Sequence, residues 1–330
     1  MTWTLFLLTA GLIVYAGTLL ARYGDVLAEK TGLGRTWIGL VVVAATTSLP
    51  ELFTGVSASV QGLPDIAVGD VLGSCMFNLL ILSLMDAVGG RIPLSSRAHQ
   101  GHALSIGLGL VLIGLVGLSL LGGAYVPRLG WLGLYSLLFA AAYLLAMRLI
   151  FRFEQRRLAG QVQAQAEARY ESLSLRTAAT RYSLAAAVVI LAATFLPHLG
   201  EQLAQQTGWG QAFVGTLLIA VTTSLPEVVV SLAAVRMGAL ELGLGNVLGS
   251  NLFNILILAL DDLAFTRGPL LASVHPSHQV AVLAVMLMYG LLLTGLTYQT
   301  FKKQTVLAWD TSGILVVYLL AMGLIFLLRT

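Results

Sequence analysis

Charged residues are scarce in this sequence: Asp, Glu, Lys and Arg make up 10% of its 330 residues, whereas 58% are hydrophobic. Soluble domains carry about 25% charged residues, so the composition excludes an ordinary globular enzyme and indicates a polytopic membrane protein. The single cysteine, Cys75, excludes an intrachain disulfide and a cysteine-clustered metal site. The hydrolase motifs His-Glu-x-x-His and Gly-x-Ser-x-Gly are also missing. We therefore expect a protein that is not an enzyme and that needs no cofactor.

Apolar runs follow one another along the whole chain, and ten of them approach the roughly 20 residues that a membrane-spanning helix needs. The first run lacks a basic leader, so we interpret it as a transmembrane helix and not as a cleaved signal peptide. The sequence thus predicts an all-α membrane protein with ten transmembrane helices. They are expected at 2–20, 37–60, 66–86, 101–121, 130–150, 182–199, 213–236, 242–263, 279–297 and 307–328.

The basic residues favour one orientation of these helices. With the N-terminus outside, 15 of the 18 Lys and Arg residues fall in inward segments, and only Arg128, Arg267 and Arg329 fall in outward ones. The positive-inside rule therefore predicts that both termini face outward. The segment 151–181, rich in Arg, Gln, Ala and Glu, becomes a cytoplasmic linker that is too short for a domain of its own. The net charge of +3 fits such anchoring, and we expect no nucleic-acid partner.

One stretch occurs twice. Residues 39–82 align without a gap with residues 215–258, at an offset of 176, and 20 of the 44 positions are identical. Both copies contain TTSLPE, followed by GDVLGSCMFN or GNVLGSNLFN. Five helices precede the second copy, so the copies must insert with opposite topology, which is the inverted-repeat plan of secondary transporters. We predict a first five-helix repeat over 1–150, the linker, and a second, inverted five-helix repeat over 182–330.

Each copy places one carboxylate, Glu51 or Glu227, inside an apolar run. Such intramembrane acids are costly and usually mark ion pathways.

Pro50 and Pro226 directly precede these two glutamates. A proline removes one backbone N–H and displaces the carbonyl four residues back. The freed oxygens are ligands that Na⁺ and Ca²⁺ prefer. A plain proline kink or a protonated glutamate is the alternative for either copy taken alone. Hydroxyl groups lie in the same turns, on Thr47, Ser48, Thr223 and Ser224.

The second half of each motif lies one helix later. Ser74 and Asn78 are four residues apart, as are Ser250 and Asn254, so each pair shares one helix face. These side chains would supply neutral oxygens to the same site. The alternative is that they serve close helix packing, for which the neighbouring glycines are suited.

Other polar residues are open to several interpretations. Asp70 stands where the other copy has Asn246, and we predict that it lies close to one membrane surface. There it would attract entering cations or bind a proton. A solvated helix end is the alternative. Asp86 and Asp262 are interpreted as solvated or capping residues. The two pairs of histidines, His99 with His102 and His275 with His278, should lie on opposite sides of the membrane, which excludes a single four-histidine site.

The doubled TTSLPE, with Gly-Ser-x-x-x-Asn one helix later, resembles the sodium/calcium exchanger family of the cation/calcium exchanger superfamily, in its prokaryotic form. The resemblance covers nearly the whole chain. It implies alternating access, in which Ca²⁺ is extruded in exchange for Na⁺. By position, it implies that Ca²⁺ is bound by the carboxylates of Glu51 and Glu227 and the carbonyls of Thr47 and Thr223. The Na⁺ ligands that it implies include Ala44, Ser48, Ser74, Asn78, Ala220, Ser224, Ser250 and Asn254.

The sequence departs from the family pattern at three positions. Asn254 stands where many sodium/calcium exchangers carry Asp, which argues against potassium co-transport. Asp70 stands where Asn is usual, and Cys75 where Asn is common. The linker also lacks an acidic Ca²⁺-binding loop of the kind found in the regulatory domains of animal exchangers.

The leading functional hypothesis is a Na⁺/Ca²⁺ antiporter in the cell (inner) membrane, with no obligate protein partner. An antiporter on the same fold that exchanges H⁺ for Ca²⁺ or another divalent cation is the alternative, motivated by Asp70. A passive channel is disfavoured because inverted repeats suit alternating access. We further expect the first helices of the two repeats, near 2–20 and 182–199, to slide across the rest of the protein, because they carry no intramembrane charge.

Overall fold

The computed structural model describes residues 2–99, 101–160, 170, 173–207 and 220–328, and this part is helical apart from one small hairpin. The hairpin pairs β1 (Arg128–Leu129) with β2 (Leu132–Gly133). The long helices are α1 (Thr2–Thr31), α5 (Pro64–Val88), α7 (Gly101–Gly122), α8 (Leu134–Gly160), α9 (Leu175–Thr207), α13 (Leu240–Ala264), α14 (His278–Tyr298) and α15 (Trp309–Leu327). The short elements are α2 (Arg35–Trp37), the π-helix η1 (Ile38–Val43), α3 (Ala44–Thr47), α4 (Leu49–Gln61), α6 (Leu94–Arg97), η2 (Gly123–Tyr125), α11 (Ala220–Thr223), α12 (Leu225–Arg236) and η4 (Leu270–Ala272).

The all-α membrane class is confirmed. In the described ranges, eight helices are long and apolar enough to cross a membrane, or nine if the bent pair Arg35–Thr47 and Leu49–Gln61 forms one span. The predicted span at 213–236 begins outside the described residues and continues through α11 and α12. The helix predicted from residue 130 begins only at Leu134, because Gly130, with φ of 64°, turns the chain between β1 and β2.

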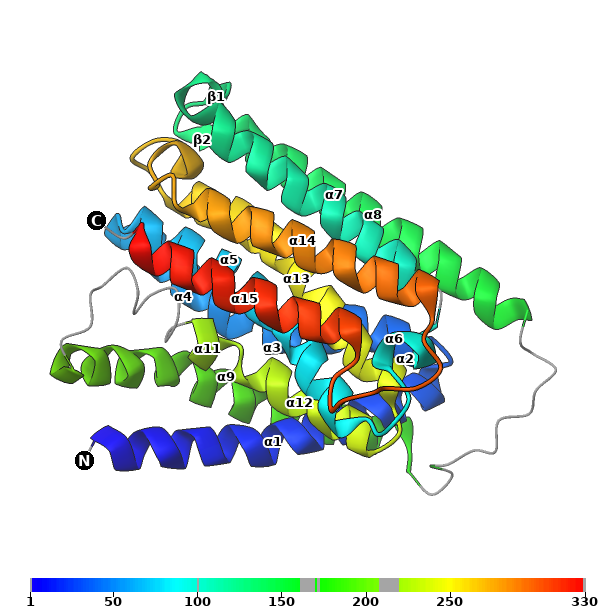
Figure 1. Ribbon diagram of the computed structural model, residues 1–330. Helices are drawn as coiled ribbons and strands as arrows, with labels where there is room; N and C mark the ends of the chain where they lie inside the picture. The colour runs from blue at the N-terminus through cyan, green and yellow to red at the C-terminus, as the bar shows by residue number, and fades with distance from the viewer. Residues whose placement is uncertain (1, 100, 161–169, 171–172, 208–219, 329–330) are drawn as a thin grey trace.

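Two helices form the centre of the molecule. In their most apolar stretches, 89% of α13 and 72% of α5 are buried, against 28% of α1. Figure 1 shows α5 and α13 in the middle of the molecule, with α7 and α8 on one side and α1 and α9 on the other. The residues of α5 and α13 pack with α7, α8, α14 and α15 into one large hydrophobic core.

Helices α1 and α9 lie side by side along one edge of the molecule (Figure 1). Their buried residues belong to two smaller hydrophobic clusters, separate from the main core and shared with α12 and η1. Each of these helices belongs to the pair that the sequence predicts to slide. The structure thus gives the pair its own packing surface, and the sliding of these helices stays a prediction.

Glycines allow α13 to approach the π-helix closely. A Cβ atom at Gly249 would collide with the carbonyl oxygen of Leu40, and one at Gly245 would lie 2.7 Å from the carbonyl oxygen of Thr36. The packing role expected for these motif glycines is therefore confirmed in the second copy. The π-helix itself, which widens the helix just before the TTSLPE motif, gave no signal in the sequence; such elements are frequent at functional sites.

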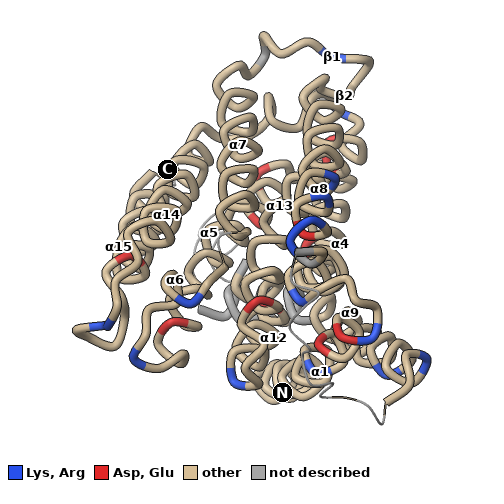
Figure 2. Tube along the Cα trace, turned by 90° about the vertical axis from the view of Figure 1, so that its right-hand side faces the viewer, with Lys and Arg blue, Asp and Glu red and all other residues tan. Residues whose placement is uncertain are grey.

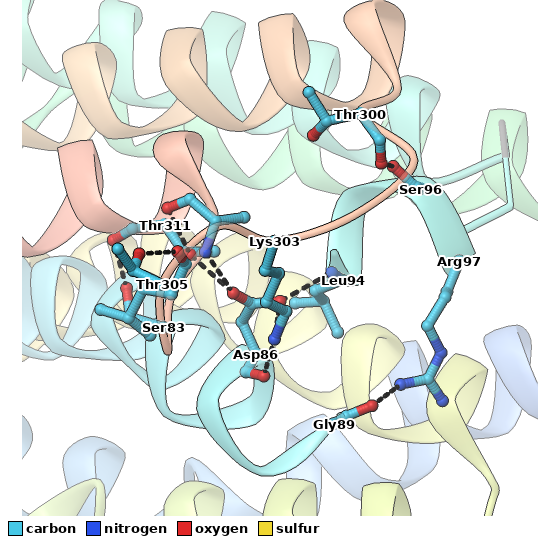
Figure 3. Close-up of polar contacts among 12 residues, drawn as sticks. Ser83, Asp86, Gly89, Leu94, Ser96, Arg97, Thr300, Lys303, Thr305 and Thr311 are labelled. Carbon is cyan, nitrogen blue, oxygen red and sulfur yellow. Dashed lines mark hydrogen bonds and ion pairs between the residues drawn. The ribbon is translucent and has the colours of Figure 1, made fainter. Parts of the chain in front are cut away.

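Asp86 and Asp262 were interpreted as solvated or capping residues; the solvated interpretation is wrong, and both cap the first amide of a following short helix, at Leu94 and Leu270. Asp86 is 1% exposed and accepts hydrogen bonds from the Leu94 and Ala308 amides and the Thr311 hydroxyl. It also forms an ion pair with Lys303 Nζ at 2.8 Å (Figure 3).

Asp262 is fully buried and accepts hydrogen bonds from Gly133 N, Leu270 N, Tyr135 OH and Ser136 Oγ. Loop segments cover both carboxylates because their free amides need acceptors.

Candidate functional site

Two breaks in the helices create the candidate site. The helix α3 ends at Thr47 and α4 begins at Leu49, with Ser48 between them at φ −90° and ψ 7°. In the same way Ser224, at φ −82° and ψ 7°, separates α11 from α12. Pro50 and Pro226 occupy the first turns of α4 and α12, where a missing N–H costs little. The first break bends the chain by 42°, so the proline motif does interrupt the helix as predicted.

The two breaks face each other through their serines and glutamates. Ser48 Oγ donates a hydrogen bond of 3.0 Å to Glu227 Oε1, and Ser224 Oγ donates one of 3.0 Å to Glu51 Oε1. All four side chains are fully buried. The carboxylate that follows each break is thus held by the hydroxyl of the other break.

The central helices add a second hydroxyl to each carboxylate. Ser74 Oγ of α5 lies 3.4 Å from Glu51 Oε1, and Ser250 Oγ of α13 lies 3.2 Å from Glu227 Oε1. The same oxygen of each glutamate therefore accepts both of its serine bonds. The other oxygen, Oε2, accepts no hydrogen bond from the described residues.

Two threonines extend the arrangement to Asp70 and Asn246. Thr47 Oγ1 donates to Asn246 Oδ1 at 3.0 Å, and Thr223 Oγ1 donates to Asp70 Oδ1 at 3.1 Å. Asp70 is fully buried, so the interpretation as part of a solvated helix end is wrong, whereas its place close to one membrane surface and its role as an entry charge or a proton site stay predictions. It lies only two turns into α5, but the neighbouring helices cover it, which position along the sequence could not reveal.

Several buried oxygens of the site have no hydrogen-bond partner in the part of the chain that the structure describes. They are Glu51 Oε2, Glu227 Oε2, Asp70 Oδ2, Asn78 Oδ1 and Asn254 Oδ1. A buried polar atom without a partner costs free energy. The free Oε2 atoms belong to the two glutamates that the serines of the breaks hold, and they indicate a site completed by a ligand that attracts oxygen, namely a cation.

The donor set restricts which cation fits. Its atoms are carboxylate, amide and hydroxyl oxygens, the ligands of hard cations such as Na⁺ and Ca²⁺. Among the described residues, no three Asp, Glu, His or Cys side chains meet closely enough to hold a metal by themselves. Neutral oxygens must therefore complete the coordination of any metal ion.

The alanines predicted to donate carbonyl oxygens lie beside the breaks. Ala44 begins α3, and its carbonyl accepts the Ser48 amide at 3.0 Å and the Thr47 hydroxyl at 3.2 Å. Ala220 begins α11. The carbonyl of Ala44 is thus close to the break, but its bonds within the helix would have to be shared with a bound ion.

Cys75 and Asn251 border the site. Asn251 Nδ2 donates to the carbonyl of Cys75 at 3.2 Å, and Asn254 Nδ2 lies 3.7 Å from Cys75 Sγ. These contacts connect α13 to α5 next to Asn254. Asn251 was not among the predicted site residues, although its place three residues before Asn254, on the same helix face, is a signal that could have found it.

The histidines do not share a site. His102, at the start of α7, contacts Glu241 at the start of α13 with 2.5 Å between Nε2 and Oε2. His278, at the start of α14, contacts Asp65 at the start of α5 at 3.0 Å. Glu241 lies 176 residues after Asp65, and His278 lies 176 after His102. Each histidine therefore pairs with an acid from the other half of the chain.

The fold and the site together define a class of protein. The chain is an all-helical, multi-pass membrane protein whose broken helices surround a buried centre of carboxylates and neutral oxygens. Such broken helices are tolerated in a membrane where they face protein or a polar cavity, and transporters use them to bind ions. The class is that of membrane transporters and not of enzymes.

Comparison with known proteins gives the family. The model of the family described as "Sodium/calcium exchanger protein" matches residues 1–152 and 182–327. The chain belongs to the sodium/calcium exchanger protein family, which confirms the resemblance found in the sequence. The gap between the two matches corresponds to the predicted linker.

Relatives and solved structures agree with this assignment. The chain is 27% identical over 282 residues to the inner membrane protein YrbG of Escherichia coli, covering 85% of each chain. It is 26% identical to the sodium/calcium exchanger MaX1 of Methanosarcina acetivorans, over 74% of this chain and 77% of that one. It is also similar to a structure of the sodium-calcium exchanger NCX_Mj soaked with Na⁺ and Sr²⁺, with a TM-score of 0.74, 23% identity and coverage of 98% and 97%. This last likeness shows the fold.

Proposed function

We propose that the protein is a secondary antiporter that exchanges Ca²⁺ for Na⁺ by alternating access at the buried centre. The observation that carries the proposal is the reciprocal pairing of the two breaks: Ser48 holds Glu227, Ser224 holds Glu51, and both Oε2 atoms remain free. Two carboxylates balance the charge of one Ca²⁺. The relative MaX1 is itself named a sodium/calcium exchanger.

The proposed ligands are those that the family resemblance implies. Glu51 and Glu227 bind Ca²⁺ through their free carboxylate oxygens, and Thr47 and Thr223 bind it through their carbonyls. Asn78 and Asn254 support the proposed Na⁺ sites because their Oδ1 atoms are buried without a partner among the described residues. The remaining proposed Na⁺ ligands are Ala44, Ala220, Ser48, Ser224, Ser74 and Ser250.

The proposed architecture is two inverted five-helix repeats, 1–150 and 182–330, joined by a cytoplasmic linker at 151–181. Contacts at the offset of 176 support it, because the bond from Thr47 to Asn246 has its counterpart between Thr223 and Asp70, and the bond from Ser74 to Glu51 has its counterpart between Ser250 and Glu227. The termini lie at the same end of the helices (Figure 1), as expected when both face outward. Figure 2 views the molecule from the right-hand side of Figure 1 and shows basic segments near α6, α8, α9 and α12.

Proton-coupled exchange is the second candidate, and one observation favours it. Asp70 adds a third buried carboxylate where the other half has the neutral Asn246, and its Oδ2 is free. Three negative charges exceed the charge of one Ca²⁺, and a proton on Asp70 would remove the excess. The relative CaxA of Alkalimonas amylolytica, 28% identical over 233 residues, is named a putative antiporter with no ion stated.

Transport in proteoliposomes distinguishes these functions. Purified protein is reconstituted in vesicles loaded with Na⁺, and uptake of radioactive Ca²⁺ is followed at clamped pH. Uptake that disappears when choline replaces Na⁺ supports Na⁺/Ca²⁺ exchange. Uptake that ignores Na⁺ but follows an imposed pH gradient assigns the protein to the proton-coupled alternative, and flux without dependence on any counter-ion contradicts both.

A further inference from the structure

Asp261 is a buried carboxylate that the proposed exchange site does not use. It is fully buried near the end of α13, and neither of its oxygens has a hydrogen-bond partner in the described ranges. The adjacent Asp262, by contrast, accepts four hydrogen bonds. Burial of a carboxylate without any donor is costly, and a residue with so costly an environment is a functional candidate.

Asp261 faces α4 at a glycine. A Cβ atom added to Gly55 would lie 2.5 Å from Asp261 Oδ2 and 2.7 Å from Oδ1. Gly55 follows Glu51 by one helical turn, about 6 Å along the axis. Beyond it α4 ends at Gln61, whose carbonyl accepts a bond from Arg267 at 3.2 Å. Asp261 therefore lies beside α4 between the exchange site and the surface at which α4 ends.

This feature exists in only one half of the chain. The residues at the offset of 176 are Met85, which corresponds to Asp261, and Ser231, which corresponds to Gly55. Met85 is buried, and its terminal methyl group packs against Gly243. One half thus has an apolar side chain where the other has an acid, so the two halves differ in charge at this position.

A proton suits this position better than a metal ion. Hard metal ions require about six or more oxygen ligands, whereas Asp261 offers its own two oxygens against the backbone of a glycine. A proton needs one oxygen and makes the buried carboxyl neutral. Asp70 on α5 and Asp262 on α13 act on Asp261 electrostatically. The surrounding elements also carry Glu51 on α4, Tyr135 on α8 and Arg267 in the loop after α13.

We propose that Asp261 is a proton-binding site linked to the exchange site, protonated while that site is empty and ionised when a cation occupies it. The inference rests on the proposed function, since it requires a cation in the centre. The positive charge of the cation offsets the negative charges of Asp70 and Glu51, which favours release of the proton from the Asp261 carboxyl to solvent. By linkage, protonation of Asp261 weakens cation binding by the same factor.

Proton release on Ca²⁺ binding tests this link. Ca²⁺ is added to purified protein in a weakly buffered detergent solution. A pH indicator then measures the number of protons released, and calorimetry measures the number of Ca²⁺ ions bound. Asp261→Asn, which is isosteric, and Asp261→Met, which copies the other half, should each release up to one proton fewer per bound Ca²⁺. In both variants the Ca²⁺ affinity should also change less with pH than in the wild type, by a factor of up to about ten for each pH unit. The matched control Ser59→Ala removes another unpartnered buried group of α4 and should behave as wild type.

The outcomes separate the inference from the proposed function. If both variants bind Ca²⁺ and release as many protons as the wild type, Asp261 is not the proton site, and the exchange function stands. If the wild type binds neither Ca²⁺ nor Na⁺, the proposed function fails first. The Met variant removes an unpaired buried acid, so it keeps the test valid if the Asn variant folds poorly.

Discussion

Ser48 Oγ donates a hydrogen bond to Glu227 Oε1 at 3.0 Å, although 179 residues separate the two in the sequence. The converse pair, Ser224 and Glu51, has the same length. Each glutamate is therefore positioned by the helix break that does not precede it. Neither half of the chain can build the centre alone, because each supplies the carboxylate of one pair and the hydroxyl of the other.

This reciprocity predicts equal effects of the two serines. Ser48→Ala and Ser224→Ala each remove one hydrogen bond to a carboxylate, which contributes about 1.5–3 kcal/mol. We expect each variant to weaken Ca²⁺ binding by roughly tenfold or more, as measured by calorimetry. The exposed Ser57→Ala is the control. A large effect at one serine and none at the other would show that the centre is not built reciprocally.

The glutamates should be individually essential for Ca²⁺. Glu51→Gln and Glu227→Gln each keep the side-chain shape but leave one of the two glutamate carboxylates for a divalent ion. Because one charge and one ligand are lost, we expect Na⁺-driven Ca²⁺ uptake to fall by about 100-fold or more. Glu154→Gln, in α8 and paired with Arg157, should transport normally. Uptake that persists in the double variant would contradict the proposed site.

Asp70→Asn separates the two coupling modes. It makes the first half match the second, where Asn246 accepts the bond from Thr47 at 3.0 Å. If Na⁺ drives exchange, uptake in Na⁺-loaded vesicles should remain within a few-fold of wild type. Should Asp70 instead carry the coupled proton, the variant will lose uptake driven by a pH gradient and keep Ca²⁺ binding.

Lys303 should contribute to stability and not to ion selectivity. Its Nζ lies 2.8 Å from Asp86 Oδ1 with both side chains buried (Figure 3), and breaking a buried pair costs about 3–5 kcal/mol. Because three other donors still hold Asp86, we expect Lys303→Met to lose roughly 2–3 kcal/mol, seen as a lower Tm in detergent. The adjacent exposed Lys302→Met should leave Tm unchanged, and equal Tm values for both would refute the anchoring role.

The sequence predicted the helical class and the breaks because both depend on local chemistry. Apolar length marks the spans, and Pro50 and Pro226 mark the interruptions. It could not predict which serine reaches which glutamate, since the four atoms come together only when both halves pack. The duplication indicated one shared centre, and the contacts show it to be reciprocal.

Burial of isolated acids was the main failure of sequence reasoning. Asp70, Asp86 and Asp262 lie near helix ends in the sequence, yet all three are buried. Distance from a helix end says nothing about lateral neighbours, and here loops and adjacent helices cover these carboxylates. Asp261 had a usable signal, because its counterpart in the other half is Met85 and not an acid.

The packing of α1 against α12 allows a direct test of sliding. A Cβ atom at Gly17 would lie 3.3 Å from Val229 Cβ, close to the 3.5–4.5 Å that a disulfide requires. We expect Gly17→Cys with Val229→Cys to form a disulfide under oxidation and to abolish Ca²⁺/Na⁺ exchange, with recovery on reduction. Equilibrium Ca²⁺ binding should persist in the oxidised form, because Gly17 and Val229 do not contribute to the centre. Each single cysteine variant is the control, and exchange at the wild-type rate in the fully cross-linked protein would exclude a slide of α1 past α12.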